Sequence, residues 1–286
     1  MPIKQILVPL TGESKAEHVC DMAFAVAKAT AAHVVGTDTV TDPGPFLDQT
    51  GVGMMATYYD ELMKTADKVQ AQKRKVAAEA FDAARARSNA TAADAPVKGN
   101  GVTATWVDGA DYNGATVSLF GRLADLIVVN RPGDKASYAE MQVFETAVFT
   151  ARKPVLVVPP KAKSLGHRAA IAWNGSIEAC AAAGAAIDLM KGMDGVEIIQ
   201  VGDIPDGNAS SQALAAYLGW HGLTARIHAV KDAGKTGALI LSEAKSAGAS
   251  CLVMGAYTHS PLRELILGGV TSHMIGHSDL PLVMAH

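Results

Sequence analysis

The chain has 286 residues, a length that allows two domains of ordinary size, because single domains commonly comprise roughly 100 to 200 residues. Hydrophobic residues make up 49% of the chain, charged residues 19%, and the formal net charge is -3. This composition predicts a globular protein. It lacks the basic excess that is typical of nucleic-acid-binding proteins, so we do not expect nucleic acid as a partner.

The N-terminal stretch "MPIKQILVPLTGES" has no long apolar segment with a small-residue cleavage site. No later apolar run reaches the roughly 18 residues of a membrane span, so we expect a cytoplasmic protein that does not contact a membrane. The three cysteines, Cys20, Cys180 and Cys251, are far apart in the sequence. This pattern offers neither a disulfide framework nor a CxxC metal site, and it predicts buried free thiols.

The same order of strand and helix signals occurs twice along the chain. In the first half, short apolar strands with their turns are predicted at residues 5–14, 33–40, 102–108, 124–130 and 153–160. In the second half, they are predicted at residues 168–177, 196–203, 224–230, 249–255 and 280–286. Helical patterns lie between the strands, beginning with residues 16–32 in the first half and 178–192 in the second.

The first half carries an insertion at about residues 52–95, between its second and third strands. Within it, residues 60–89 interleave charged side chains with Ala, Leu, Val and Phe at helical spacing, which predicts an amphipathic helix of several turns. We interpret this helix as a surface helix that covers the sheet. A partner-docking helix and, together with the preceding glycine-rich loop, a lid are the alternatives.

Continuous Val, Ile and Leu strands that alternate with helices are typical of a parallel sheet covered on both faces. The predicted fold class is therefore α/β, with two tandem Rossmann-like domains, each a five-stranded parallel sheet with helices on both faces. The predicted domains are residues 1–160 and 166–286, joined within the segment Pro159–Arg168. The two halves are expected to pack as an intrachain pseudo-dimer.

Ligands of such sheets bind beyond the carboxyl ends of the strands. In the second half, this rule points to the turn Ala172–Ser176 and to the segment that begins at Gly255. The pair Gly268–Gly269, followed by Val270 and Thr271, has the character of a phosphate cradle at a helix N-terminus. Alternatively, these glycines only end a short helix that starts at Ser260–Pro261.

The duplicated strand order, the turn "NGS" and the segment "VMGAYTHSPLRELILGGVTSHMI" before "LPLVMAH" resemble the universal stress protein family in its tandem form. The resemblance covers essentially the whole chain and is most specific over residues 248–286. It implies domains of the adenine nucleotide alpha hydrolase-like type and a non-catalytic role in stress response. In nucleotide-binding members, a glycine, two residues, a glycine, nine residues, and then glycine and Ser or Thr hold the ribose and phosphates of ATP. An aspartate after the first strand contacts the adenine region.

This sequence keeps the spacing of that pattern, with Gly255 and Gly268 as its first and third glycines, but three residues differ. Thr258 replaces the second glycine, Gly269 replaces the hydroxyl residue, and Asn174 replaces the aspartate. ATP is therefore a candidate ligand of the second half, and no metal site is expected. The implied cofactor-binding residues are Ala172, Trp173, Asn174, Val201, Met254, Gly255, Thr258, His259, Gly268, Gly269, Val270 and Thr271.

The first half departs further from the family pattern. Thr11 stands where the family has its aspartate. When the two halves are aligned, Met141 and Gln142 occupy the positions of Gly268 and Gly269. We therefore expect a degenerate site there and a structural or partner-facing domain. A homodimer, formed through the last strands or the long helix, is a candidate assembly.

Two further features of the second half allow alternatives. His273 and His277, with Asp279 nearby, have a spacing that suits either a metal or exposed, helix-capping histidines. Trp173 either belongs to the core or stacks in the pocket. For the whole chain, the leading hypothesis is a regulatory stress protein that binds an adenine nucleotide. The alternatives are a ligand-free interaction scaffold and a slow nucleotide hydrolase.

Overall fold

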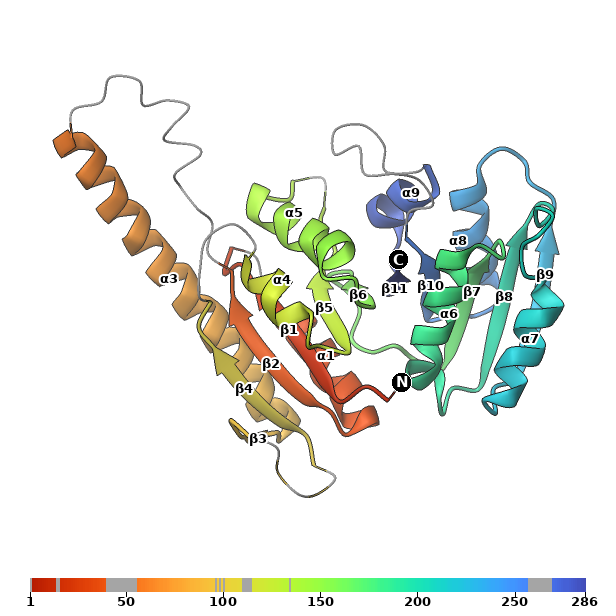
Figure 1. Cartoon of the computed structure of the whole chain (residues 1–286), viewed down its shortest axis with the longest axis horizontal. Helices are drawn as coiled ribbons and strands as arrows, with labels where there is room; N and C mark the ends of the chain where they lie inside the picture. The colour runs from red at the N-terminus through yellow and green to blue at the C-terminus, as the bar shows by residue number, and fades with distance from the viewer. Residues whose placement is uncertain are drawn as a thin grey trace.

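The computed structural model describes residues 2–13, 16–39, 56–95, 97, 99, 101–109, 115–133, 135–256 and 269–286 (Figure 1). The strands of the first half are β1 (Gln5–Leu10), β2 (His33–Asp38), β3 (Thr91–Ala92), β4 (Thr103–Val107), β5 (Leu126–Asn130) and β6 (Val155–Val158). Those of the second half are β7 (Arg168–Trp173), β8 (Gly195–Val201), β9 (Ala225–Val230), β10 (Cys251–Gly255) and β11 (Leu282–Ala285).

Helices alternate with these strands. The first half contains α1 (Glu17–Thr30), α3 (Ala56–Ser88), α4 (Ala115–Gly121), α5 (Tyr138–Glu145) and a π-helical turn, η1 (Thr146–Thr150). The second half contains α6 (Ile177–Met190), α7 (Ser211–Trp220), α8 (Thr236–Ser246) and α9 (Gly269–His277). None of the helices in the described ranges is long and apolar enough to cross a membrane.

The strands form one eleven-stranded sheet in the order β3-β4-β2-β1-β5-β6-β11-β10-β7-β8-β9. Within each half the strands are parallel, and the order β4-β2-β1-β5-β6 is repeated as β9-β8-β7-β10-β11. The predicted α/β fold with two Rossmann-like halves is thus confirmed. The sequence did not predict β3, because its two exposed residues have no apolar pattern.

The two halves join through an antiparallel pairing of β6 with β11, in which Leu282 lies opposite Val157. Each of these strands therefore has a neighbour on both sides, and the last strands are not available to pair with a second chain. Arg131 links the halves further, because its Nη1 donates to the carbonyl oxygens of Ile275 at 2.8 Å and Gly276 at 2.9 Å. A cation from the first half thereby caps the C-terminal end of α9.

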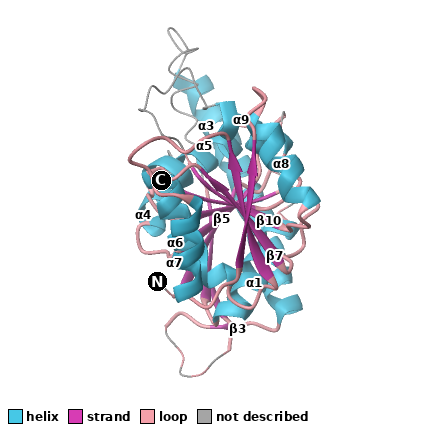
Figure 2. Ribbon diagram, turned by 90° about the vertical axis from the view of Figure 1, so that its right-hand side faces the viewer, coloured by secondary structure: helices cyan, strands magenta, loops and turns pink. Residues whose placement is uncertain are grey.

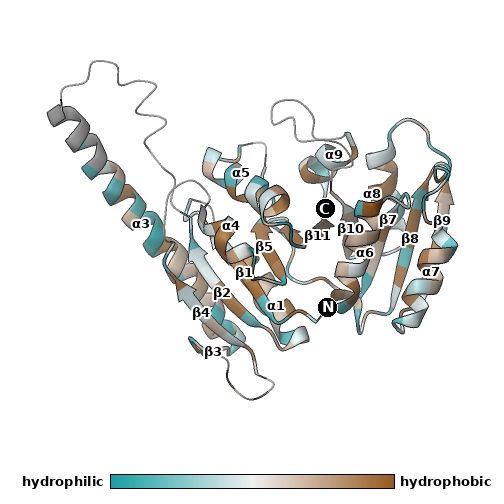
Figure 3. Cartoon of the chain, in the orientation of Figure 1, coloured by the Kyte–Doolittle hydropathy of each residue, from teal (hydrophilic) through white to brown (hydrophobic). Residues whose placement is uncertain are grey.

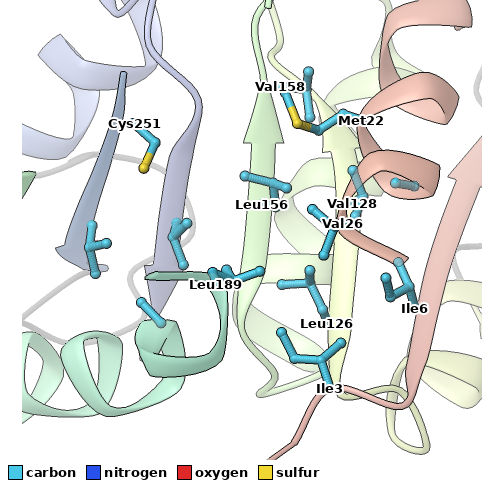
Figure 4. Close-up of a cluster of buried hydrophobic side chains, with 14 of the residues drawn as sticks. Ile3, Ile6, Met22, Val26, Leu126, Val128, Leu156, Val158, Leu189 and Cys251 are labelled. Carbon is cyan, nitrogen blue, oxygen red and sulfur yellow. The ribbon is translucent and has the colours of Figure 1, made fainter. Parts of the chain in front are cut away.

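Helices cover both faces of the twisted sheet (Figure 2). One face packs against α1, α3, α6 and α7, and the other against α4, α5, α8 and α9. Adjacent strand residues alternate between the two cores, so that Ile171 belongs to the first and Ala170 to the second. Figure 4 shows that the first core continues from Leu126 and Leu156 of the first half to Leu189 of the second.

The helix predicted within residues 60–89 is α3, which has 33 residues and is therefore about 50 Å long. Its C-terminal part buries Ala77, Phe81 and Ala84, and the Phe81 ring centroid lies 5.4 Å from that of Phe24. Its N-terminal part extends beyond the sheet (Figure 1), and the described portion there is largely hydrophilic (Figure 3). The helix therefore covers the sheet only with its C-terminal part.

The prediction of three buried thiols is wrong for Cys180, which is exposed, whereas Cys20 and Cys251 are buried. The reason is the orientation of α6, whose buried side is formed by Ala179, Ala182 and Ala183 while Cys180 faces solvent. Burial raises the pKa of the Cys20 and Cys251 thiols to about 12. Both thiols are therefore protonated and unreactive near neutral pH.

We expect a thiol reagent to modify one cysteine in the native protein and all three after denaturation, because only Cys180 is accessible. Absorbance of the released chromophore at pH 7.5 measures the number of reactive thiols. A Cys180→Ser variant is expected to show no rapid native reaction. Rapid modification of that variant would mean that the helix α1 or the strand β10 opens readily.

Candidate functional site

A cavity of about 180 Å³ lies at the carboxyl edge of the second half of the sheet. Strands β7, β8 and β10 end there, and helices α6, α8 and α9 begin there. This is the position where open parallel sheets bind ligands. The described residues that line it are Ala172, Trp173, Asn174, Ser176, Glu178, Ala179, Ile199, Val201, Thr236, Ile240, Met254, Gly255, Val270 and Thr271.

Most of the residues predicted from the sequence come together in this cavity. Its lining includes Ala172, Trp173, Asn174, Val201, Met254, Gly255, Val270 and Thr271. Gly269 starts α9 but is not among the lining residues. Thr258, His259 and Gly268 lie outside the described residues, as does the short helix predicted from Ser260.

Sequence reasoning pointed to the turn that contains Ser176, but it missed the contributions of three elements. The missed residues are Glu178 and Ala179 of α6, Thr236 and Ile240 of α8, and Ile199 of β8. The family pattern covers only the ends of the first and fourth strands of each half. The signal that could have found these residues is general, because every helix that follows a parallel strand begins at the carboxyl edge of the sheet.

The turn after β7 has a fixed geometry. The Asn174 Oδ1 accepts from the Ser176 backbone N-H at 3.1 Å, and the Asn174 carbonyl accepts from Asn208 Nδ2, also at 3.1 Å. Gly175 has φ +72, and a Cβ there would lie 2.4 Å from the Ala209 carbonyl oxygen, so glycine is required. The Asn174 Oδ1, which stands where the family pattern has an aspartate oxygen, therefore accepts a hydrogen bond from the backbone of its own turn.

Trp173 combines the two roles that the sequence left open. It is 4% exposed, belongs to the first core, and donates from Nε1 to the Ala209 carbonyl oxygen at 3.0 Å. It also lines the cavity wall. Its ring is thus held in place by core packing and a hydrogen bond, which makes it a rigid part of that wall.

Gly255 lets the first turn of α6 approach the end of β10. A Cβ at this position would lie 2.7 Å from the Ala179 nitrogen and 2.7 Å from the Glu178 carbonyl carbon. The start of α6 is fixed locally by Ser176, whose Oγ accepts from the Ala179 N-H at 3.2 Å. The first glycine of the family pattern is therefore required for helix packing in this fold.

The equivalent edge of the first half is nearly filled. Asn130 ends β5 as Gly255 ends β10, and His18 is the second residue of α1 as Glu178 is of α6. The His18 Nε2 and the Asn130 Oδ1 lie 2.9 Å apart in a hydrogen bond. The cavity there measures only about 20 Å³.

Two other features also separate the first half from the second. Met141 and Gln142 lie inside the continuous helix α5, which is stabilised by a capping box between Ser137 and Glu140. In addition, α3 packs on the turn after β1, where a Cβ on Gly12 would lie 2.1 Å from the Lys73 carbonyl oxygen. In the described chain, these contacts leave little space for a ligand at this edge.

The histidine pair of α9 forms a stack, with ring centroids 4.4 Å apart and an interplanar angle of 13°. His277 Nδ1 donates to the His273 carbonyl oxygen at 3.0 Å, while burial and the neighbouring His277 lower the pKa of His273. Asp279 instead lies 3.7 Å from Lys245 Nζ. Among the described residues, no group of three His, Cys, Asp or Glu side chains could hold a metal ion.

The fold and the cavities together define a duplicated Rossmann-like α/β protein whose second half has an open cavity at the sheet edge and whose first half has a nearly filled one. Residues 206–286 match the model of the Universal stress protein family. Over this segment the chain resembles the universal stress proteins, as the sequence predicted, and the strand order of its first half is repeated in its second half.

One solved structure has the same fold over almost the whole chain. A universal stress protein from Archaeoglobus fulgidus has a TM-score of 0.65 and 18% identity, and the match covers 98% of this chain and 95% of that one. The universal stress protein UspA from Lactobacillus plantarum has a TM-score of 0.31 and 14% identity, over 42% of this chain and 97% of that one. A universal stress protein in complex with cAMP has a TM-score of 0.34 and 20% identity, over 55% and 98%. A search of curated proteins finds no match.

Proposed function

We propose that the protein is a regulatory, non-catalytic tandem universal stress protein that binds an adenine-containing ligand in its C-terminal half, with ATP among the candidates. The observation that carries this proposal is the cavity between the ends of β7 and β10 and the start of α9. In nucleotide-binding members of the family that the chain resembles, the same three elements hold the ligand.

The chemistry of the lining supports binding more than catalysis. A nucleotide hydrolase needs a general base and carboxylates that hold a metal ion. Among the described lining residues, Glu178 is the only carboxylate, and no metal-holding group occurs in the described chain. The apolar side chains Ile199, Ile240 and Met254 instead provide the surface that a purine ring would bury.

The first half, in this proposal, is a structural domain. Its candidate site is filled by the hydrogen-bonded pair His18 and Asn130, and its sheet is extended by β11 of the second half. The N-terminal part of α3 extends beyond the sheet, and its described side chains Glu61, Lys64 and Thr65 are exposed, which favours a second function, the docking of a partner protein or of a second chain. We place the domain boundary in the coil between β6 and β7.

Isothermal titration with ATP and magnesium, and separately with adenosine, tests the binding function. We expect the wild-type protein to bind at least one of these ligands. A Val270→Phe variant is expected to lose about tenfold in affinity, because Val270 lines the cavity and the added ring would occupy part of the space for the ligand. The matched control is Val69→Phe, since Val69 is 48% exposed on α3. Absence of binding by the folded wild-type protein would leave the scaffold function as the better description.

A further inference from the structure

The cavity has two chemically different sides. On one side lies the first turn of α6, which contributes Ser176, Glu178 and Ala179, and this helix packs on the first face of the sheet. On the other side lie the starts of α8 and α9, which contribute Thr236 and Val270 and pack on the second face. A ligand in the cavity therefore meets α6 with one edge and the α8 and α9 helices with the other.

The α6 side carries the charge. Of the described lining residues, Glu178 is the only ionisable one, and none of the described basic side chains forms a salt bridge with it. It is half-buried, and an ionised carboxylate can only accept hydrogen bonds. Because the Ser176 hydroxyl already accepts from the first turn of α6, Glu178 is not needed as its cap.

The comparison of the two halves shows why this carboxylate can face a ligand. In the first half, the side chain at the same helix position, His18, is held by the Asn130 side chain at the end of β5. In the second half, the residue at the end of the corresponding strand is Gly255, which has no side chain to bind Glu178. Because Gly255 has no side chain, it neither occupies the cavity nor binds the Glu178 carboxylate as Asn130 binds His18 in the first half.

We propose that Glu178 is a specificity-determining residue that selects ligands by their hydrogen-bond donors, and that the ribose hydroxyl groups of an adenine ligand lie against α6. This inference rests on the proposed function. A carboxylate accepts charge-assisted hydrogen bonds from a vicinal diol, and such bonds are about twice as strong as neutral ones. The same charge repels phosphate, so that phosphate groups are directed away from α6.

The test is a set of titrations that removes the donors from the ligand and the acceptor from the protein. We expect wild-type protein to bind adenosine about tenfold more tightly than 2′,3′-dideoxyadenosine, because the diol donates to Glu178. In a Glu178→Leu variant, which keeps the bulk, this ratio is expected to fall to about twofold or less. Glu178→Gln keeps one acceptor oxygen and is expected to give an intermediate ratio.

Glu145→Leu is the matched control, because Glu145 is an exposed residue of α5 that lines neither cavity. It should leave the wild-type ratio unchanged, and circular dichroism should show that every variant is folded. If both adenosine compounds bind but their affinity ratio is the same in wild type and Glu178→Leu, the role of Glu178 is disproved while the proposed function stands. If folded wild-type protein binds none of adenosine, dideoxyadenosine and ATP, both proposals fail.

Discussion

A Gly255→Ala variant is expected to lose about 2–4 kcal/mol of unfolding free energy. The added methyl group would lie 2.7 Å from backbone atoms of Glu178 and Ala179, and backbone atoms cannot move aside as a flexible side chain can. The first turn of α6 must then shift away from β10, which also changes the cavity wall that this turn forms. We therefore expect the affinity for an adenine ligand to fall together with the stability.

Urea unfolding followed by circular dichroism measures this loss. The matched control is Gly276→Ala on α9, where no atom of the described residues outside the helix's own neighbouring backbone lies within 4 Å of the added Cβ. Alanine is favoured over glycine in a helix, so this variant should be unchanged or more stable by about 0.5–1 kcal/mol. Equal stability of Gly255→Ala and the wild-type protein would show that α6 is not held against β10 by this contact.

A Glu197→Gln variant is expected to lose about 1–3 kcal/mol of unfolding free energy at pH 7. The Glu197 side chain is 2% exposed, and its two oxygens accept from Arg168 Nη1 and, at 2.7 Å, from His228 Nε2. The loss is moderate for a buried carboxylate because the Arg168 and His228 side chains are 30% and 35% exposed, and water can therefore solvate them after the substitution.

The interactions of Glu197 with Arg168 and His228 also predict that the stability of the protein is sensitive to acid. Burial raises the pKa of Glu197, but the hydrogen bonds from His228 and Arg168 outweigh burial and lower it below the ordinary value. A lowered pKa in the folded state stabilises the protein above the pKa of the unfolded state, near 4.3, and this stabilisation is lost as the pH falls through the folded-state pKa.

As the pH falls from 7 through about 4.3, the ordinary pKa of a glutamate, the unfolding free energy of the wild-type protein should therefore begin to approach that of Glu197→Gln. The control is Glu79→Gln on α3, because Glu79 and Lys75 form an exposed pair at 3.9 Å that contributes little. If the difference in unfolding free energy between wild type and Glu197→Gln stays constant as the pH falls, the ionisation of Glu197 beside Arg168 and His228 is not the origin of the acid sensitivity.

The sequence by itself determined the duplicated fold, because buried parallel strands must be continuous apolar runs and helices must separate them. It also located most of the cavity lining, since Ala172, Asn174, Gly255 and Thr271 stand at the ends of predicted strands or at the start of a helix. The orientation of Cys180 on α6 was predicted wrongly. That helix is rich in alanine, and its pattern does not reveal which side faces solvent.

Only the tertiary structure decided how the two halves meet and which of them is open. The antiparallel pairing of β6 with β11 joins segments more than a hundred residues apart, and no local pattern encodes it. The contrast between the His18–Asn130 pair and the open space at Glu178 and Gly255 likewise depends on two elements that meet at the sheet edge. Spacing within one segment can predict a strand end, but the space beyond it depends on what packs there from elsewhere in the chain.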